Sequence, residues 1–167
     1  MRPKVRKWKR NVMFCVSSLV LLAGVSSLAV AQERSQPAAG GLDGYKNEFE
    51  VDVFFARDSA VLGEAAIKDL SNLAGIAKSL NGYMIEIAGY SSNTLSSEAD
   101  RKVSEERATA VARYFVDVKK IPAQRILVPV GYGSKQPVAS NRDAQGRELN
   151  RHVDVKILVN KKLDQGL

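Results

Sequence analysis

Residues 89–108 read GYSSNTLSSEADRKVSEERA, a polar loop that leads into a charged helix. The segment before it, residues 83–89, places two isoleucines on one face and therefore predicts a strand. Ser97 is followed three residues later by Asp100, a spacing that resembles a capping box at the start of a helix. Arg107 lies on the apolar stripe of this helix. The sequence therefore predicts that Arg107 points toward the sheet and not straight into solvent.

Two further elements are predicted on the N-terminal side of this segment. Residues 48–55 alternate apolar and polar side chains, which is typical of a half-buried strand. Residues 67–80 change to helical spacing, with charged side chains off the apolar stripe, and Asn81-Gly82 closes them. We therefore expect a strand and then an amphipathic helix.

The C-terminal half predicts two more strands. Residues 126–130 alternate, but Pro129 cannot donate a ladder hydrogen bond, so this strand is expected at a sheet edge or with a bulge. A polar loop of about eighteen residues follows, and residues 153–159 alternate again. The order strand, helix, strand, helix, strand, loop, strand predicts an α+β fold, in which two helices cover one face of a four-stranded sheet.

Four short stretches together resemble the OmpA-like peptidoglycan-binding domain family. They are Gly89–Thr94, Arg107-Ala108, Gly131-Tyr132-Gly133 and Asn150–Val153. The resemblance covers about residues 48–160 and implies that the four-stranded sheet is mixed. It also implies non-covalent binding of the peptide stem of peptidoglycan, without a cofactor.

In this family, the residue that corresponds to Arg107 holds a carboxylate of meso-diaminopimelate. An aspartate fifteen residues earlier takes the ammonium group, but here that position is Ser92. A hydroxyl accepts one hydrogen bond and cannot neutralise the ammonium, and losing a charge-assisted contact costs about 1.5–3 kcal/mol. The resemblance therefore implies weakened or altered binding, which Ser92→Asp would tighten by about tenfold or more.

Other residues leave alternatives open at this site. Asp100 stands where the family often has asparagine, and Asp58 ends the first strand-to-helix loop, so either could supply the missing carboxylate. Arg107 could instead form a salt bridge with a nearby acid, Glu98, Asp100 or Glu105, or extend its charged end to solvent. If a ligand is its partner, Arg107→Ala should cost little stability.

Three more residues complete the predicted binding site, and one histidine is placed outside it. Arg151 lies two residues before Val153, so its side chain is expected on the same face as the buried valines of the last strand. It either joins Arg107 in an anion site or pairs with Asp154, Glu148 or the second helix. The side chains that match the family loop are Asn93 and Thr94, which could also be only turn residues. His152 alternates with Val153 and is predicted to lie on the surface.

The chain begins with a basic segment, which carries six of the 25 basic residues and none of the 18 acids, followed by 21 uncharged residues. Residues 1–31 are therefore predicted to be a signal peptide that is cut before Gln32, or else an uncleaved anchor. We expect a linker at 32–46, the OmpA-like domain at 47–160 and a polar tail at 161–167. Export would place the protein in the periplasm or cell envelope, with association to the outer membrane left open.

Several classes of function are disfavoured by composition. Without the leader, the formal net charge falls from +7 to about +1, which removes the main argument for a nucleic-acid partner, since such a partner needs a basic surface on the folded domain. With one histidine and a single cysteine, which lies in the leader, neither an enzyme nor a metal site is expected. We expect a peptidoglycan-binding domain with other envelope proteins as further partners, and contact with membrane only if the leader is uncleaved. The alternative is a domain that keeps the fold as a structural or protein-interaction module.

Overall fold

The computed structural model describes residues 42–93 and 96–164. Its strands and α-helices are β1 (Tyr45–Phe54), α1 (Glu64–Lys78), β2 (Tyr83–Gly89), α2 (Ser97–Arg113), β3 (Val130–Gly131), α3 (Ala144–Asn150), β4 (His152–Asn160) and α4 (Lys161–Asp164). A π-helical turn, Tyr114–Val118, continues α2, and a short 3₁₀ turn spans Ala123–Arg125.

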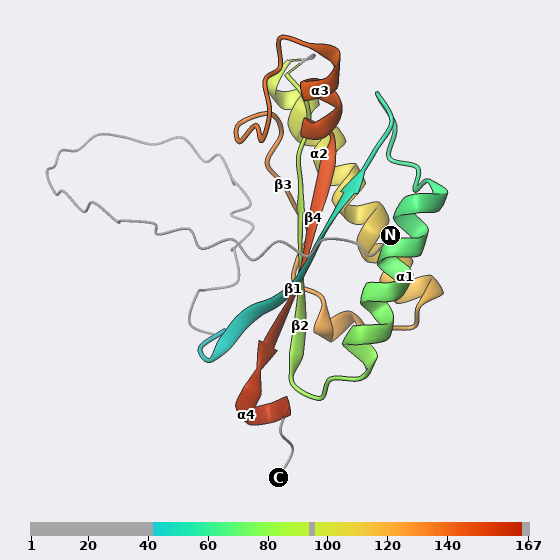
Figure 1. The fold of residues 1–167 in the computed structure, drawn as a ribbon, viewed down its shortest axis with the longest axis vertical. Coiled ribbons are helices and arrows are strands. Elements are labelled where there is room, and N and C mark those ends of the chain that lie inside the picture. Colours follow the sequence, from blue (N-terminus) through green and yellow to red (C-terminus); the bar gives the residue numbers. More distant parts are fainter. Residues whose placement is uncertain (1–41, 94–95, 165–167) are drawn as a thin grey trace, which may run out of the picture.

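The four strands form one mixed sheet in the order β1-β4-β2-β3. Strand β4 runs antiparallel to both β1 and β2, whereas β3 is parallel to β2. Both α1 and α2 lie on the same side of this sheet (Figure 1). The predicted α+β fold, with two helices on one face of a four-stranded mixed sheet, is therefore confirmed.

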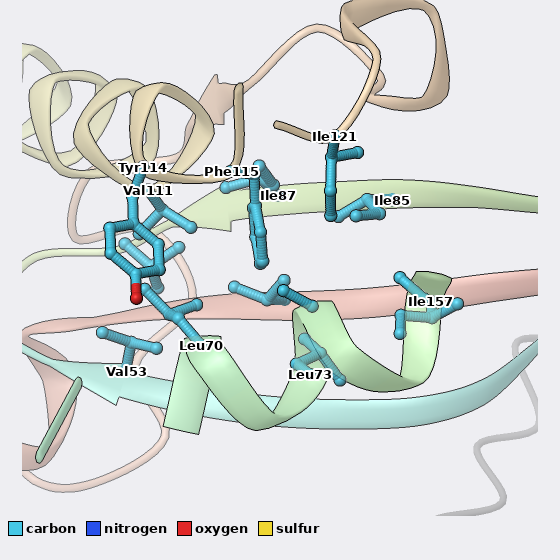
Figure 2. Packing of buried hydrophobic residues seen from close by; sticks show 14 of the residues in the cluster. Val53, Leu70, Leu73, Ile85, Ile87, Val111, Tyr114, Phe115, Ile121 and Ile157 are labelled. Carbon is cyan, nitrogen blue, oxygen red and sulfur yellow. The ribbon is translucent and has the colours of Figure 1, made fainter. Parts of the chain in front are cut away.

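Apolar side chains from the sheet and the two helices meet in one core (Figure 2). Val53 of β1 lies opposite Val153 of β4, so the register brings alternating valines of neighbouring strands to the same face. Leu70 of α1 and Phe115 after α2 belong to the same core, and each of these four side chains is at most 1% exposed. Burying a side chain of this size contributes about 1.5–3 kcal/mol, so this face holds the helices to the sheet.

The first and third strands differ from their predicted limits. β1 begins at Tyr45, so the last residues of the segment expected to be linker belong to the strand. The third strand is shorter than predicted, because only Val130 and Gly131 pair with β2 while Ile126 makes an isolated bridge to Ile85. Strand β3 lies at the sheet edge, as Pro129 predicted.

The helices also depart from the sequence patterns. Helix α3 occupies part of the segment that was predicted to be a loop, and the Asp143 carboxylate accepts a hydrogen bond from its first turn. With seven residues, α3 is too short to show a helical period in the sequence. Helix α2 is capped by Ser96, whose hydroxyl accepts from the Ala99 amide at 3.3 Å, so the predicted cap at Ser97 was wrong by one residue.

The predicted signal peptide, most of the linker and the last three residues of the tail lie outside the described residues. Their interpretation stays a prediction. Within the described residues, no helix combines the length and apolar character that a membrane crossing needs.

Candidate functional site

The glycines of the sequence motif let α2 approach the ends of β2 and β3 closely. A Cβ at Gly89 would lie 2.0 Å from the Ser104 carbonyl oxygen, and one at Gly131 would lie 2.5 Å from the Glu105 amide nitrogen. Neither position has space for a side chain. The Gly89 and Gly131 motifs therefore act through packing, by placing α2 directly over the sheet edge.

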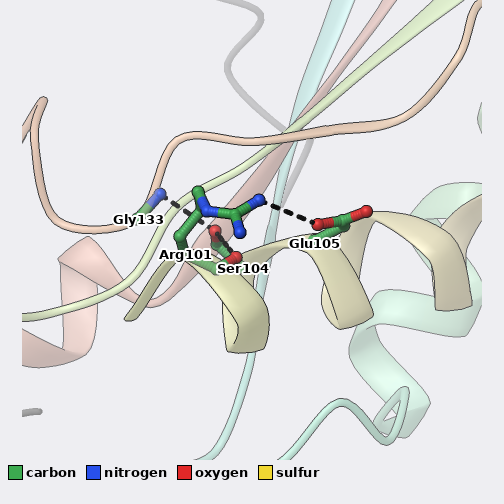
Figure 3. A network of polar contacts seen from close by, with 4 residues as sticks. All are labelled: Arg101, Ser104, Glu105 and Gly133. Carbon is green, nitrogen blue, oxygen red and sulfur yellow. Dashed lines mark hydrogen bonds and ion pairs between the residues drawn. The ribbon is translucent and has the colours of Figure 1, made fainter. Parts of the chain in front are cut away.

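A small polar network fastens the loop after β3 to α2 (Figure 3). The Ser104 hydroxyl donates to the Arg101 carbonyl at 2.7 Å and accepts from the Gly133 amide at 2.9 Å. Gly133 adopts a φ of +62°, a left-handed conformation that favours glycine. Residues 131–134 are thereby held beside the N-terminal half of α2.

Arg107 is buried between α2 and the loops at the ends of β1 and β2, with 1% exposure. Its Nε donates to the Ser59 carbonyl at 2.8 Å, and its two Nη atoms donate to the carbonyls of Ala56 at 3.1 Å and Tyr90 at 3.3 Å. The guanidinium also lies 5.5 Å from the centre of the Phe55 ring. The inward orientation predicted from the helical stripe is confirmed, but its hydrogen bonds to described residues all go to backbone oxygens.

A cavity of about 10 Å³ lies beside the guanidinium, and its lining is Asp58, Ser91, Ser92, Asp100, Val103, Arg107 and Arg151. Five of the seven residues predicted for the site therefore meet there. Asn93 is not among its lining residues. Asn93 is exposed, with its amide held by the Asn141 side chain at 3.3 Å, and Thr94 lies outside the described residues. The volume suits about one water molecule.

The two candidate carboxylates differ in their surroundings. Asp100 is 1% exposed, and its Oδ2 accepts a hydrogen bond from the Ser134 hydroxyl at 2.9 Å. Its Oδ1 is buried and has no hydrogen-bond partner among the described residues. Asp58 is exposed and pairs with Arg57 at 3.2 Å. Asp100 is therefore the carboxylate inside the site, and Asp58 lies at its rim.

Two guanidinium groups and two carboxylates surround this cavity. Burial, and then the positive charge of Arg151, lower the pKa of Arg107 to about 10, while Asp58 and Asp100 oppose the shift. Arg107 therefore stays charged at neutral pH. A site with both signs of charge and little net charge suits a zwitterionic group, since an ion that is left buried without a partner is costly.

Arg151 is half-buried just before β4. Its Nε donates to the Phe55 carbonyl at 3.3 Å, a partner that none of the sequence alternatives included. It lines the cavity with Arg107, as the anion-site interpretation requires.

His152 is buried, with 4% exposure, so the prediction that it lies on the surface was wrong. Its ring stacks on Tyr90 with centroids 4.7 Å apart, and Tyr90 in turn stacks on Tyr132 at 5.5 Å. The physical reason is that Phe54 of β1, opposite His152 in the sheet, and the two tyrosines that directly follow β2 and β3 gather around the imidazole. Burial lowers the pKa of His152 and favours its neutral form.

Sequence reasoning also gave no role to three residues that hold the loops around the site, Asn150, Asn141 and Ser134. Asn150 accepts from the amides of Val138 and Ala139, each at 2.9 Å, and donates to the side chain of Asn141. Asn141 in turn accepts from the amide of Asn93. Asn150 begins the Asn150–Val153 stretch that resembles the family, so the sequence did mark this position. Nothing in the sequence marked Ser134 as a site residue.

One group of acids could hold a metal ion among the described residues. It comprises Glu50, Asp52 and Asp154, whose ligand atoms lie within 4.8 Å of one another. The ammonium of Lys156 bonds to Asp154 and lies 3.9 Å from Glu50, so this group already has a cation. Burial raises the pKa of Asp154 to about 6, although Lys156 opposes the shift.

Several known proteins resemble this chain. The sequence profile of the OmpA family matches residues 54–151. Outer membrane protein A of Bordetella avium is 31% identical over 142 residues, which is 84% of this chain and 71% of that protein. Outer membrane porin F of Pseudomonas aeruginosa is 32% identical over 108 residues, and peptidoglycan-binding protein ArfA of Mycobacterium tuberculosis is 33% identical over 105 residues.

The matched regions cover 65% and 63% of this chain, but only 31% of porin F and 32% of ArfA, so the chain spans about a third of these two relatives. Among solved structures, the peptidoglycan-associated lipoprotein from Burkholderia pseudomallei superposes with a TM-score of 0.59 at 25% identity. That match covers 64% of this chain and 88% of the lipoprotein.

Proposed function

Because this chain belongs to the OmpA family, we propose that it associates non-covalently with peptidoglycan through the cavity beside Arg107. Two similar proteins support this function by name, the peptidoglycan-binding protein ArfA and the peptidoglycan-associated lipoprotein. Membership of this family also agrees with the prediction that the chain is not an enzyme.

The proposed ligand is the free end of meso-diaminopimelate in the peptide stem, which carries an ammonium and a carboxylate on one carbon. The observation that carries this proposal is the pairing of two arginines with a buried acid at one cavity. Arg107 uses three of the five guanidinium N–H groups on backbone oxygens, which leaves two for a ligand carboxylate. Arg151, which lines the same cavity, would contribute further donors.

Position 92 is the departure from the family pattern that affects affinity. Ser92 is 3% exposed and lines the cavity, so it is well placed to accept a hydrogen bond but brings no charge. If no other acid compensates, the ammonium loses one charge-assisted contact, which weakens binding by about tenfold to a hundredfold.

Cavity size favours a second candidate function. About 10 Å³ is far less than an amino-acid end group needs, so binding requires the surrounding side chains to move. A domain that keeps this packed arrangement in solution would serve as a structural or protein-interaction module of the envelope.

The names of the relatives also support a place in the cell envelope, since two of them are outer-membrane proteins. We propose that the chain is exported by residues 1–31 and works in the periplasm or at the outer membrane. Other envelope proteins are further partners in this proposal, and contact with membrane follows only if the leader is retained.

Arg151→Gln is expected to weaken binding to a diaminopimelate-containing muropeptide by about tenfold or more, because it removes one charged donor from the cavity. The measurement is calorimetric titration of the chain without residues 1–31, which keeps every described residue. Sedimentation with purified sacculi provides a second readout.

The matched control is Arg113→Gln, which removes an exposed charge at the end of α2, the helix that carries Arg107, at a position that does not line the cavity. Its affinity should equal that of the wild type. A muropeptide with lysine in place of diaminopimelate should bind more weakly than the natural stem, because its free end has no carboxylate. If the wild type binds neither muropeptide nor sacculi, the interaction-module function replaces the proposed one.

A further inference from the structure

Asp100 is an unusual acid within this domain. It is a carboxylate in the first turn of α2, it is 1% exposed, and one of its oxygens has no hydrogen-bond partner among the described residues. A buried acceptor without a partner costs free energy, and more so when it carries charge. The unpartnered Oδ1 therefore calls for an explanation, and the cavity that Asp100 lines with Arg107 offers one.

The position of this carboxylate is set by its surroundings. Ser134 donates to Oδ2 at 2.9 Å and thereby holds one oxygen. Ser134 is in turn positioned because Ser104 ties the amide of Gly133 to α2 at 2.9 Å. The other oxygen remains available to a donor. This arrangement holds the carboxylate in place before any ligand arrives.

Neither of the other two candidates provides such a group. Asp58 is exposed at the rim, and its charge is already paired with Arg57. Ser92 is buried in the lining but has only a hydroxyl. Within the described lining of the cavity, Asp100 is the one buried carboxylate, and it lines that cavity together with Arg107.

We infer that Asp100 supplies the negative charge that residue 92 lacks, and that it binds the ammonium of a zwitterionic ligand end while Arg107 and Arg151 bind its carboxylate. The inference rests on the proposed function. It differs from the expectation for a simple loss of the aspartate at position 92, because the charge pair is kept and its acid comes from the helix instead of the loop. Ser92→Asp then adds a second acid beside the first, and the gain in affinity should be small.

The test combines protein variants with a matched pair of ligands. One ligand is a stem tripeptide with meso-diaminopimelate, and the other has 2-aminopimelate, whose free end keeps the carboxylate but lacks the amino group. The wild type should prefer the first ligand by about tenfold or more, the effect of one charge-assisted contact. Asp100→Asn should remove this preference, because asparagine keeps the shape and the bond from Ser134 but has no charge.

Two further variants test whether the effect of Asp100→Asn comes from the binding site or only from the loss of a negative charge at the start of α2. Glu98→Gln removes the exposed acid from the same first turn and should leave the preference unchanged, which controls for the charge at the helix N-terminus. The double change Ser92→Asp with Asp100→Asn moves the acid to the loop and should restore the preference.

The outcomes distinguish the inference from the function on which it rests. If the wild type prefers the diaminopimelate ligand and Asp100→Asn keeps that preference, the inference fails and the proposed function stands. If the wild type binds neither ligand but Ser92→Asp alone binds the first, Asp100 does not supply the charge, and the native chain has lost the function. If no variant binds either ligand while circular dichroism shows all of them folded, both are overturned.

Discussion

Gly89→Ala is expected to lower the free energy of unfolding by about 3 kcal/mol or more. The new Cβ would lie 2.0 Å from the carbonyl oxygen of Ser104 and 2.9 Å from its carbonyl carbon, and both atoms are backbone. A flexible side chain could move aside, but here the whole N-terminal half of α2 must shift away from β2. Because Arg107 and Asp100 are carried by the same helix, ligand binding should fall as well.

The control for this prediction is Gly75→Ala. Gly75 is an exposed residue inside α1, and a Cβ there meets no atom within 4 Å. This change should raise the free energy of unfolding by about 0.5–1 kcal/mol, because alanine restricts the unfolded chain and favours the helix. Chemical denaturation of both variants measures the contrast. If Gly89→Ala unfolds at the same denaturant concentration as the wild type, close packing of α2 on β2 does not explain this glycine.

Arg107→Ala is expected to cost about 3–5 kcal/mol of stability in the ligand-free protein. Truncation leaves the carbonyls of Ala56, Ser59 and Tyr90 without the donors that now satisfy them, in partly buried surroundings. It also removes the largest fully buried side chain, which creates a cavity. The expectation that this change would cost little stability assumed that a ligand is the partner of Arg107. A large loss of stability is expected instead, because the hydrogen-bond partners of Arg107 in the structure are backbone oxygens.

Arg101→Ala provides the comparison on the same helix. The Arg101 side chain is 58% exposed and forms an ion pair with Glu105 at 3.4 Å. An exposed pair of this kind contributes at most about 1 kcal/mol, so its loss should shift the denaturation midpoint only slightly. Equal midpoints for Arg107→Ala and the wild type would contradict a structural role for the buried guanidinium. In that case the ligand would be its main partner.

Local periodicity in the sequence was sufficient for the α+β architecture. Strand alternation and helical stripes depend on residues two to four apart, and burial of one face against another element follows from them. The placement of Arg107 toward the sheet came from the same kind of pattern. The expectation of β3 at a sheet edge or with a bulge came instead from Pro129, which has no N–H to donate. Short elements such as α3 were missed because seven residues carry too few periods.

The partners of the site residues depended on contacts between distant segments. Arg107 reaches a carbonyl 48 residues away, and Ser134 reaches Asp100 across 34 residues. His152 is buried because Tyr90, which directly follows β2, stacks on it, whereas its own alternation along β4 indicated exposure. A residue's face can be inferred from its sequence neighbours, since the backbone period is local. Which atoms meet that face depends on how the helices and loops pack over the sheet, and no local period contains that information.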